Sequence, residues 1–166
     1  AKTGLGEFAA TALLLDFDNA PAASSQSYSM RWSDTWETVA GSFGMTALAA
    51  RQSDYNGNGP AEDLGFQSYG ASLAHGNYSG FANLDVLEGS AGQGFATSLA
   101  TLHAFQGWAD VFLNTPATGV RDLSLGLRGK GLEIIENAKP AGWALIYHDF
   151  DSDNGAVSYG REFDAV

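Results

Sequence analysis

Two acidic stretches contain the residue types of a calcium site. In DFDSDNG, Asp149, Asp151 and Asp153 fall at alternate positions, like the first ligands of a calcium hand, and DYNGNG, from Asp54, repeats the theme. A calcium hand also needs glycine at position six and a bidentate glutamate at position twelve. Both stretches have glycine at position twelve, and only the second has glycine at position six. Turns rich in Asp, Asn and Gly explain both stretches more simply, so we predict no metal site.

The other reactive side chains do not form a catalytic pattern. His75, His103 and His148 are dispersed along the chain, and cysteine is absent. The sequence has no nucleophile elbow, zinc motif or glycine-rich phosphate loop. Acidic residues are spread through the loops, so no acid–base pair can be singled out. The chain is therefore predicted not to be an enzyme and to need no cofactor.

A third set of charged residues lies on the polar faces of predicted strands. In a channel, such side chains create a field that biases the passage of ions. The alternative is that they neutralise one another across neighbouring strands and take no part in transport. The candidates for lining a pore are Arg31, Asp122, Arg128, Arg161, Glu162 and Asp164.

The amino-acid composition limits the classes of protein to which this chain could belong. The 166 residues include 21 glycines, with 12% aromatic but only 16% charged residues, which suits a β protein with many turns. The net charge of −11 makes nucleic acid a poor partner. No apolar run approaches the length of a spanning helix, and no signal peptide is recognisable. The start AKTGLGEF has no initiator methionine, which indicates a processed end or the middle of a longer chain.

Alternation of polar and apolar residues predicts about eight strands of roughly ten residues. The clearest is VRDLSLGLRG, where Leu123, Leu125 and Leu127 alternate with polar or small residues. SDTW, from Ser33, and HGNYSG, from His75, are predicted to be short connections, and the third strand is predicted over 36–50. Residues 52–63 and the region 95–112 are predicted to be long connections. The other predicted strands begin near Gly6, Ser25, Phe81, Pro140 and Ala156, and one further strand, after residue 63, has Tyr69, Ala71 and Leu73 opposite Ser68 and Ser72.

Ten-residue strands with alternating short and long connections are typical of a transmembrane β-barrel, whose apolar side chains face lipid. A soluble sandwich also alternates, although its strands are usually shorter. Aromatic residues decide little here, because they suit either a membrane-interface girdle or a soluble core. The residues concerned are Trp32, Trp36, Trp143, Tyr28, Tyr69, Tyr147 and Tyr159.

The stretch FATSLATLHAFQGWADVF, residues 95–112, has apolar residues at a mainly helical spacing. One interpretation is a partly helical loop that folds into the barrel and narrows it. The other is an external loop with a small hydrophobic cluster of its own. His103 is predicted to be a hydrogen-bonded structural histidine. The candidates for a constriction are Leu102, His103, Phe105, Trp108 and Asp110.

Three stretches carry a resemblance to a known family: FATSLATLHAFQGWADVFLNTPATGVRDLSLGL, WALIYHDFDSDNGAVSYGREFDAV and TGLGEFAATALLLDFDN. Together they resemble porin-like outer-membrane barrels of proteobacteria, a family related to alginate-export porins. The resemblance implies a Gram-negative outer-membrane location with lipid as a partner. Members of the family are longer and end in an aromatic strand, so residues 1–166 are expected to form either one barrel domain or the C-terminal half of a larger barrel.

Passive diffusion of small solutes or ions is the function that these observations predict. An alginate conduit would need many lumenal Arg and Lys residues, and here acidic residues outnumber them. A complete eight-stranded barrel would be filled by side chains and would conduct poorly. Two alternatives therefore stay open: a structural barrel that anchors a larger surface assembly, and a soluble β-sandwich that binds carbohydrate or another partner. A homo-oligomer is compatible with each.

Overall fold

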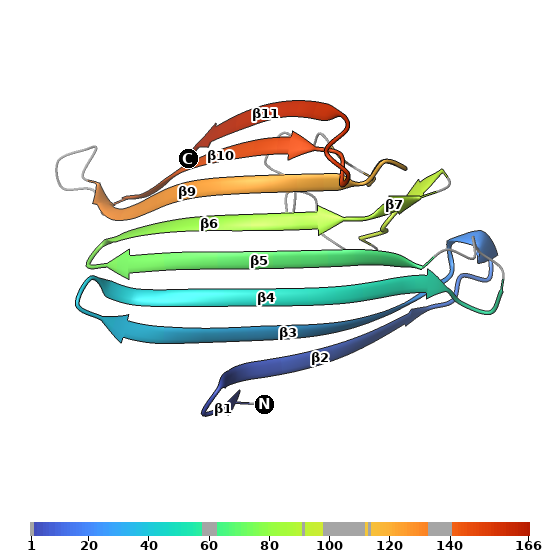
Figure 1. Cartoon of the computed structure of the whole chain (residues 1–166), viewed down its shortest axis with the longest axis horizontal. Coiled ribbons are helices and arrows are strands. Elements are labelled where there is room, and N and C mark those ends of the chain that lie inside the picture. The colour runs from blue at the N-terminus through green and yellow to red at the C-terminus, as the bar shows by residue number, and fades with distance from the viewer. Residues whose placement is uncertain (1, 58–62, 91, 98–111, 113, 133–140) are drawn as a thin grey trace.

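The computed structural model describes residues 2–57, 63–90, 92–97, 112, 114–132 and 141–166 (Figure 1). These residues form β-strands and one 3-10 turn, η1 (Pro21–Ala23). Eight strands are long: β2 (Gly6–Leu15), β3 (Ser25–Thr38), β4 (Gly41–Asp54), β5 (Leu64–His75), β6 (Tyr78–Leu87), β9 (Val120–Leu132), β10 (Ala141–Asp151) and β11 (Ser158–Ala165). Three have two residues each: β1 (Lys2–Thr3), β7 (Gly89–Ser90) and β8 (Gln93–Gly94). The prediction of an all-β chain with about eight long strands is confirmed.

The long strands form one antiparallel sheet in which each strand pairs with the next long strand along the chain. The order is β1-β2-β3-β4-β5-β6-β9-β10-β11, and β7 pairs with β8 as a separate hairpin (Figure 1). Within the described residues the sheet is open, with β1 and β2 at one edge and β11 at the other. Closure into a barrel therefore stays a prediction.

The connections differ in length at the two ends of the sheet (Figure 1). At one end, which we call the short-turn end, residues 39–40 join β3 to β4 and residues 76–77 join β5 to β6, while the β9–β10 connection at this end, residues 133–140, lies outside the described residues. At the opposite, long-loop end, the connections are residues 16–24, 55–63, 88–119 and 152–157. Within the described part of the chain, no helix is long and apolar enough to cross a lipid bilayer.

The β3–β4 turn corrects the prediction that SDTW is a connection and that the next strand begins at residue 36. β3 continues through these residues to Thr38, with Trp32 and Trp36 on one face and Ser33 and Thr35 on the other, and Asp34 is a polar exception beside the tryptophans. The turn follows at residues 39–40 and ends at Gly41, whose φ of 125° is a conformation that favours glycine. A β-carbon on Gly41 would also lie 2.2 Å from the carbonyl oxygen of Ala74.

The strand pairing divides the side chains into two faces, because residues directly opposite in antiparallel strands share a face. The apolar face carries the large apolar and aromatic residues Phe8, Leu14, Tyr28, Met30, Trp32, Trp36, Phe43, Met45, Tyr69, Leu73, Tyr78, Leu84, Val86, Leu123, Leu125, Leu127, Trp143, Leu145, Tyr147 and Phe163. The polar face carries Ser27, Ser29, Arg31, Ser33, Thr35, Ser42, Thr46, Gln52, Ser68, Ser72, Ser79, Asn83, Asp85, Asp122, Ser124, Arg128, His148, Glu162 and Asp164.

Candidate functional site: the two faces of the sheet

Burial on β9 is opposite to that of a soluble sheet. Leu123, Leu125 and Leu127 are 40%, 47% and 57% exposed, whereas Asp122 and Ser124 on the polar face are 2% and 5% exposed. The other large hydrophobic residues of the long strands that are exposed also lie on the apolar face. A soluble antiparallel sheet buries its apolar face against a second layer and exposes its polar face. A contiguous exposed apolar surface of this kind marks an interaction with a membrane or with another protein.

A buried ionisable pair connects β9 and β10 on the polar face. The Nδ1 atom of His148 lies 2.9 Å from Oδ2 and 3.0 Å from Oδ1 of Asp122. On its other side, Nε2 of His148 lies 3.7 Å from Oδ2 of Asp164, and Glu162 lies directly opposite His148 on β11. An imidazole between carboxylates is stabilised in its charged form, because each neighbouring carboxylate attracts the positive charge.

Asp85 extends this group of acidic side chains onto β6. It lies directly opposite Asp122 and accepts a hydrogen bond from Ser68 on the neighbouring strand β5. Like charges directly opposite each other are unfavourable, and the hydrogen bond from Ser68 and, to a smaller extent, the nearby His148 offset the repulsion. The sequence shows these residues but not their proximity. Asp122 lies opposite Phe150, diagonal to His148, and this register is not encoded in the pattern of either strand.

The structure places five of the six predicted pore-lining residues on the polar face. Asp122, Glu162 and Asp164 belong to the acidic group around His148. Arg31 is exposed on β3, and the guanidinium of Arg128 lies 4.6 Å from the ring centroid of Phe81.

Arg161 lies on the opposite face from the prediction. It shares the apolar face with Phe163, and its Nε donates to Oδ1 of Asp149 at 3.2 Å. Simple alternation already separates Arg161 from its neighbours Glu162 and Asp164. The structure therefore does not group it with the pore-lining candidates.

Small residues dominate the polar face over β3, β4 and β5. Serines and threonines are the most frequent residues there, and on β4 and β5 they are interspersed with glycine and alanine. The neighbouring side chains pack closely around these glycines. A β-carbon on Gly70 would lie 2.6 Å from Thr46 Oγ1 and from Asn83 Oδ1. This half of the polar face is thus lined by hydroxyl groups, and the half formed by β6 and β9–β11 is lined by charges.

Two glycines of β9 are covered by aromatic rings on opposite faces. On the polar face, a β-carbon on Gly126 would lie 2.2 Å from the ring of Phe81, which is directly opposite on β6. On the apolar face, one on Gly129 would lie 2.4 Å from the ring of Trp143 on β10. Each glycine lets a neighbouring ring lie flat against the backbone, and the ring in turn shields the exposed peptide.

The polar face is filled by apolar side chains at the long-loop end. Leu64, Phe66, Leu87 and Phe95 form a buried cluster, with the rings of Phe66 and Phe95 5.7 Å apart. Phe95 opens the 95–112 stretch, so the start of this stretch packs against the polar face.

Gln52 holds the same segment by two hydrogen bonds. Its Oε1 accepts from the backbone N–H of Ala96 at 2.8 Å, and its Nε2 donates to the carbonyl of Ala96 at 2.9 Å. At the far end of the stretch, Phe112 packs edge-on against Phe150, also on the polar face. Both described ends of the stretch therefore meet the polar face. The predicted constriction residues Leu102, His103, Phe105, Trp108 and Asp110 lie outside the described residues.

The apolar face has an aromatic border at the short-turn end. The rings of Trp36 and Phe43 stack 5.9 Å apart, and Tyr78 and Trp143 lie 6.4 Å apart. Trp32, 6.2 Å from Trp36, lies further from the turn, at the middle of β3. The indole Nε1 of Trp32 donates to the carbonyl of Leu5 at 2.8 Å, so this ring combines an apolar surface with a satisfied polar group. Such rings suit the boundary between hydrocarbon and water.

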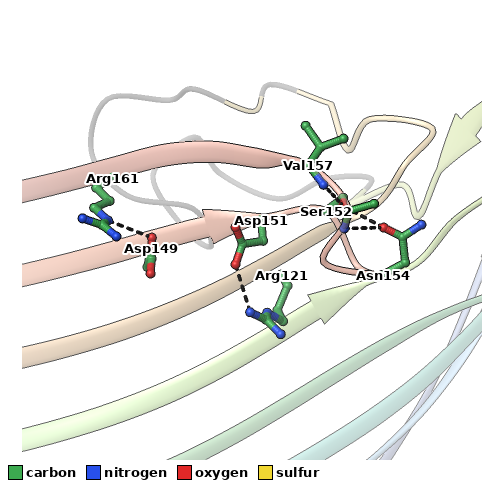
Figure 2. A network of polar contacts seen from close by, with 8 residues as sticks. Arg121, Asp149, Asp151, Ser152, Asn154, Val157 and Arg161 are labelled. Carbon is green, nitrogen blue, oxygen red and sulfur yellow. Dashed lines mark hydrogen bonds and ion pairs between the residues drawn. The ribbon is translucent and has the colours of Figure 1, made fainter.

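The long-loop end of the apolar face is ionic instead, and the carboxylates of DFDSDNG are used there (Figure 2). Asp149 binds Arg161, and Oδ2 of Asp151 accepts from Arg121 at 2.9 Å. Asp153 accepts from the backbone N–H of Gly89. These carboxylates therefore have separate partners instead of converging on a cation. No group of three or more Asp, Glu and His side chains within the described ranges is arranged to hold a metal ion.

The β10–β11 turn is stabilised by side-chain to backbone bonds (Figure 2). The hydroxyl of Ser152 accepts from the backbone N–H of Val157 at 3.0 Å and donates to Oδ1 of Asn154 at 2.8 Å. This accounts for the Asp- and Asn-rich sequence as a turn, as the sequence predicts.

Comparison with protein-family models, with curated proteins and with solved structures finds no match to this chain. The resemblance to porins related to alginate export therefore stays a prediction that depends on the stretches quoted above.

Proposed function

We propose that this chain forms the wall, or part of the wall, of an outer-membrane β-barrel through which small solutes or ions diffuse passively. In this proposal the apolar face contacts lipid and the polar face borders water. The observation that carries it is the burial on β9, where leucines are exposed and the aspartate and serine between them are buried.

Free energy favours a lipid partner for the apolar face. Moving a leucine-sized side chain out of water stabilises it by about 1.5–3 kcal/mol. The apolar face exposes many such side chains on successive strands. Contact with hydrocarbon would remove all of them from water, so the free energy gained would be large. The long strands have from 8 to 14 residues, comparable with the ~9–11 residues of a tilted spanning strand.

The two ends of the sheet are also consistent with this proposal. Bacterial outer-membrane barrels have short turns on one side and longer loops on the other, with aromatic girdles at the interfaces. Here the short turns coincide with the border formed by Trp36, Phe43, Tyr78 and Trp143. The long-loop end would then face away from the periplasm.

A barrel in lipid must also pair its edge strands, because hydrocarbon offers no partner for backbone N–H and C=O groups. β2 and β11 are separated by an even number of strands, so they run in opposite directions. They are therefore able to pair antiparallel with each other. In a larger barrel, an even number of further strands between them would preserve the same alternation of directions.

The polar lining suits hydrophilic solutes without a strong preference for anions. β3–β5 contribute mainly hydroxyl groups, and β6 and β9–β11 contribute more carboxylates than cations. Small residues such as Ser29 and Gly70 occupy little of the interior. This lining supports diffusion of small polar solutes over a dedicated path for a polyanion such as alginate.

A second candidate function is a structural barrel without permeation. The apolar cluster of Leu64, Phe66, Leu87 and Phe95 favours it, because these side chains fill the polar face at the long-loop end. Water does not pass readily through an apolar constriction.

Two measurements test the proposal and separate the candidates. Extraction from membranes should need detergent, and the folded protein should migrate differently in gels before and after heating. Purified full-length protein should then give discrete current steps in planar bilayers. Insertion without current steps at any salt concentration would support the structural barrel, and a protein that stays dispersed in plain buffer would contradict both.

A further inference from the structure

Three of the five arginines lie on the apolar face, and all three lie at its long-loop end. Arg51, Arg121 and Arg161 are each among the first or last four residues of their strand at this end. The other two arginines, Arg31 and Arg128, lie on the polar face. The opposite border of the apolar face is aromatic, so its two ends differ in chemistry.

Neighbouring carboxylates hold these three guanidinium groups in place. Arg121 contacts Asp151 at 2.9 Å and Arg161 contacts Asp149 at 3.2 Å (Figure 2), and Arg51 contacts Glu88 at 3.0 Å. Their side chains are nevertheless 46%, 72% and 61% exposed, respectively. A guanidinium has five N–H donors in a rigid fork, so one carboxylate contact leaves capacity for another acceptor.

We propose that Arg51, Arg121 and Arg161 bind the phosphate groups of lipid head groups in the leaflet at the long-loop end. The inference rests on the proposed function, because it requires the adjoining leucines to contact acyl chains. Charge and position both point to this partner. Arginine binds phosphate through two parallel N–H···O bonds, and the three arginines border the apolar face where the hydrocarbon would end.

The ion pairs Arg121–Asp151 and Arg161–Asp149 on β9–β11 also suit contact with a layer of charged head groups. The acidic neighbours Asp149 and Asp151 fix the guanidinium orientation before a phosphate arrives, which lowers the entropy lost on binding. Together with Glu88 they offset the three arginines one for one, so the phosphate contact is local and directional rather than a general attraction to anions.

The test compares two bilayers that differ in phosphate. Full-length protein is inserted into phosphatidylglycerol vesicles and into phosphate-free digalactosyl diacylglycerol vesicles with matched acyl chains. The variants are the double substitution Arg121→Gln/Arg161→Gln and, as the matched control on the polar face, Arg31→Gln. Urea unfolding midpoints are measured for each protein in each bilayer.

We expect the double variant to lose urea resistance in phosphatidylglycerol and to match the wild type in the galactolipid. Arg31→Gln should behave alike in both bilayers. Equal losses of the double variant in both bilayers, or no loss in either, would overturn the lipid contact while leaving insertion intact. If millimolar inorganic phosphate in galactolipid vesicles stabilises the wild type as much as phosphatidylglycerol does, the arginines form a site for soluble anions instead.

A direct measurement keeps the proposal testable if the double variant does not fold. In wild-type protein carrying 13C at arginine Cζ, solid-state NMR should show dephasing of the arginine signal by lipid phosphorus. Its absence would contradict the proposal. If the wild-type protein does not insert into either bilayer, the proposed function itself fails, and that outcome is distinct from loss of the phosphate contact.

Discussion

The apolar and polar faces of this sheet differ most clearly along a single strand. On β9, neighbouring residues alternate between exposed leucine and buried Asp122, Ser124 or Gly126. The alternation in sequence is the same for a soluble sheet and for the wall of a membrane barrel. The difference lies in which half of the pattern is buried, and here it is the polar half. The contrast teaches that burial, and not periodicity, distinguishes the two architectures.

Breaking the ionic pair on the polar face is expected to have the largest effect. Asp122→Ala leaves His148 buried beside Asp164 without its closest carboxylate, which should destabilise the fold by about 3–5 kcal/mol. Urea unfolding in lipid vesicles measures the loss. The matched control is Asp149→Ala, which breaks an exposed pair with Arg161 and should leave the unfolding midpoint nearly unchanged. Equal losses would contradict the contrast between the faces.

The next largest difference in stability is expected between two arginine substitutions that lie on opposite faces of β3. Met30→Arg puts a charge on the apolar face, where lipid contact would cost about 2–4 kcal/mol near the middle of the bilayer. Ser29→Arg, one residue away, puts the same charge on the polar face and should be nearly neutral. Because Met30 is already exposed, both substitutions should be mild if the apolar face meets water. Folding yield and stability in vesicles decide between these outcomes.

Packing around two individual glycines, one on each face, should give a smaller difference in stability. Gly126→Ala puts a methyl group against the ring of Phe81, which should cost about 1–3 kcal/mol through forced displacement of the ring. On the apolar face, Gly80→Ala meets Leu127 at 3.4 Å and should cost less. Thermal unfolding of the two variants in the same detergent provides the comparison. A larger loss for Gly80→Ala would contradict it.

The smallest expected global effect concerns the anchor at Gln52. Gln52→Ala removes both hydrogen bonds to Ala96 and leaves that peptide partly unsatisfied, for a cost of about 1–3 kcal/mol confined to this segment. Gln67→Ala on the apolar face, where Oε1 accepts from the hydroxyl of Tyr69, is the control. Limited proteolysis should be faster after residue 95 in the first variant only. Unchanged proteolysis would show that Gln52 does not anchor the segment.

The fold was largely predictable because alternation is strong in most strands. The prediction was wrong at SDTW, where the polar residues between two tryptophans resemble a turn but belong to β3. The true turn is formed by Val39 and Ala40, which are not typical turn residues. The one typical turn residue next to it is Gly41. Propensity alone therefore misplaced it, and the backbone conformation of Gly41 is the feature that fixes it.

The site was less predictable than the strands. Which residues share a face follows from alternation, and this holds for Asp122, Glu162 and Asp164. That His148 contacts Asp122 depends on the register between β9 and β10, which is set by cross-strand packing along the whole pair. The ion pairs at the long-loop end of the apolar face were not predictable from the sequence either, because strand pairing is what brings Arg121, Asp149 and Asp151 together.

A cysteine scan of β3 tests the central claim most directly, since the chain contains no cysteine of its own. Single cysteines at residues 27–32 are labelled with an environment-sensitive fluorophore in reconstituted vesicles. The account predicts that labels at Met30 and Trp32 are quenched by brominated acyl chains, and that labels at Ser29 and Arg31 are quenched by aqueous iodide. Quenching by iodide at every position, without a two-residue period, would contradict it.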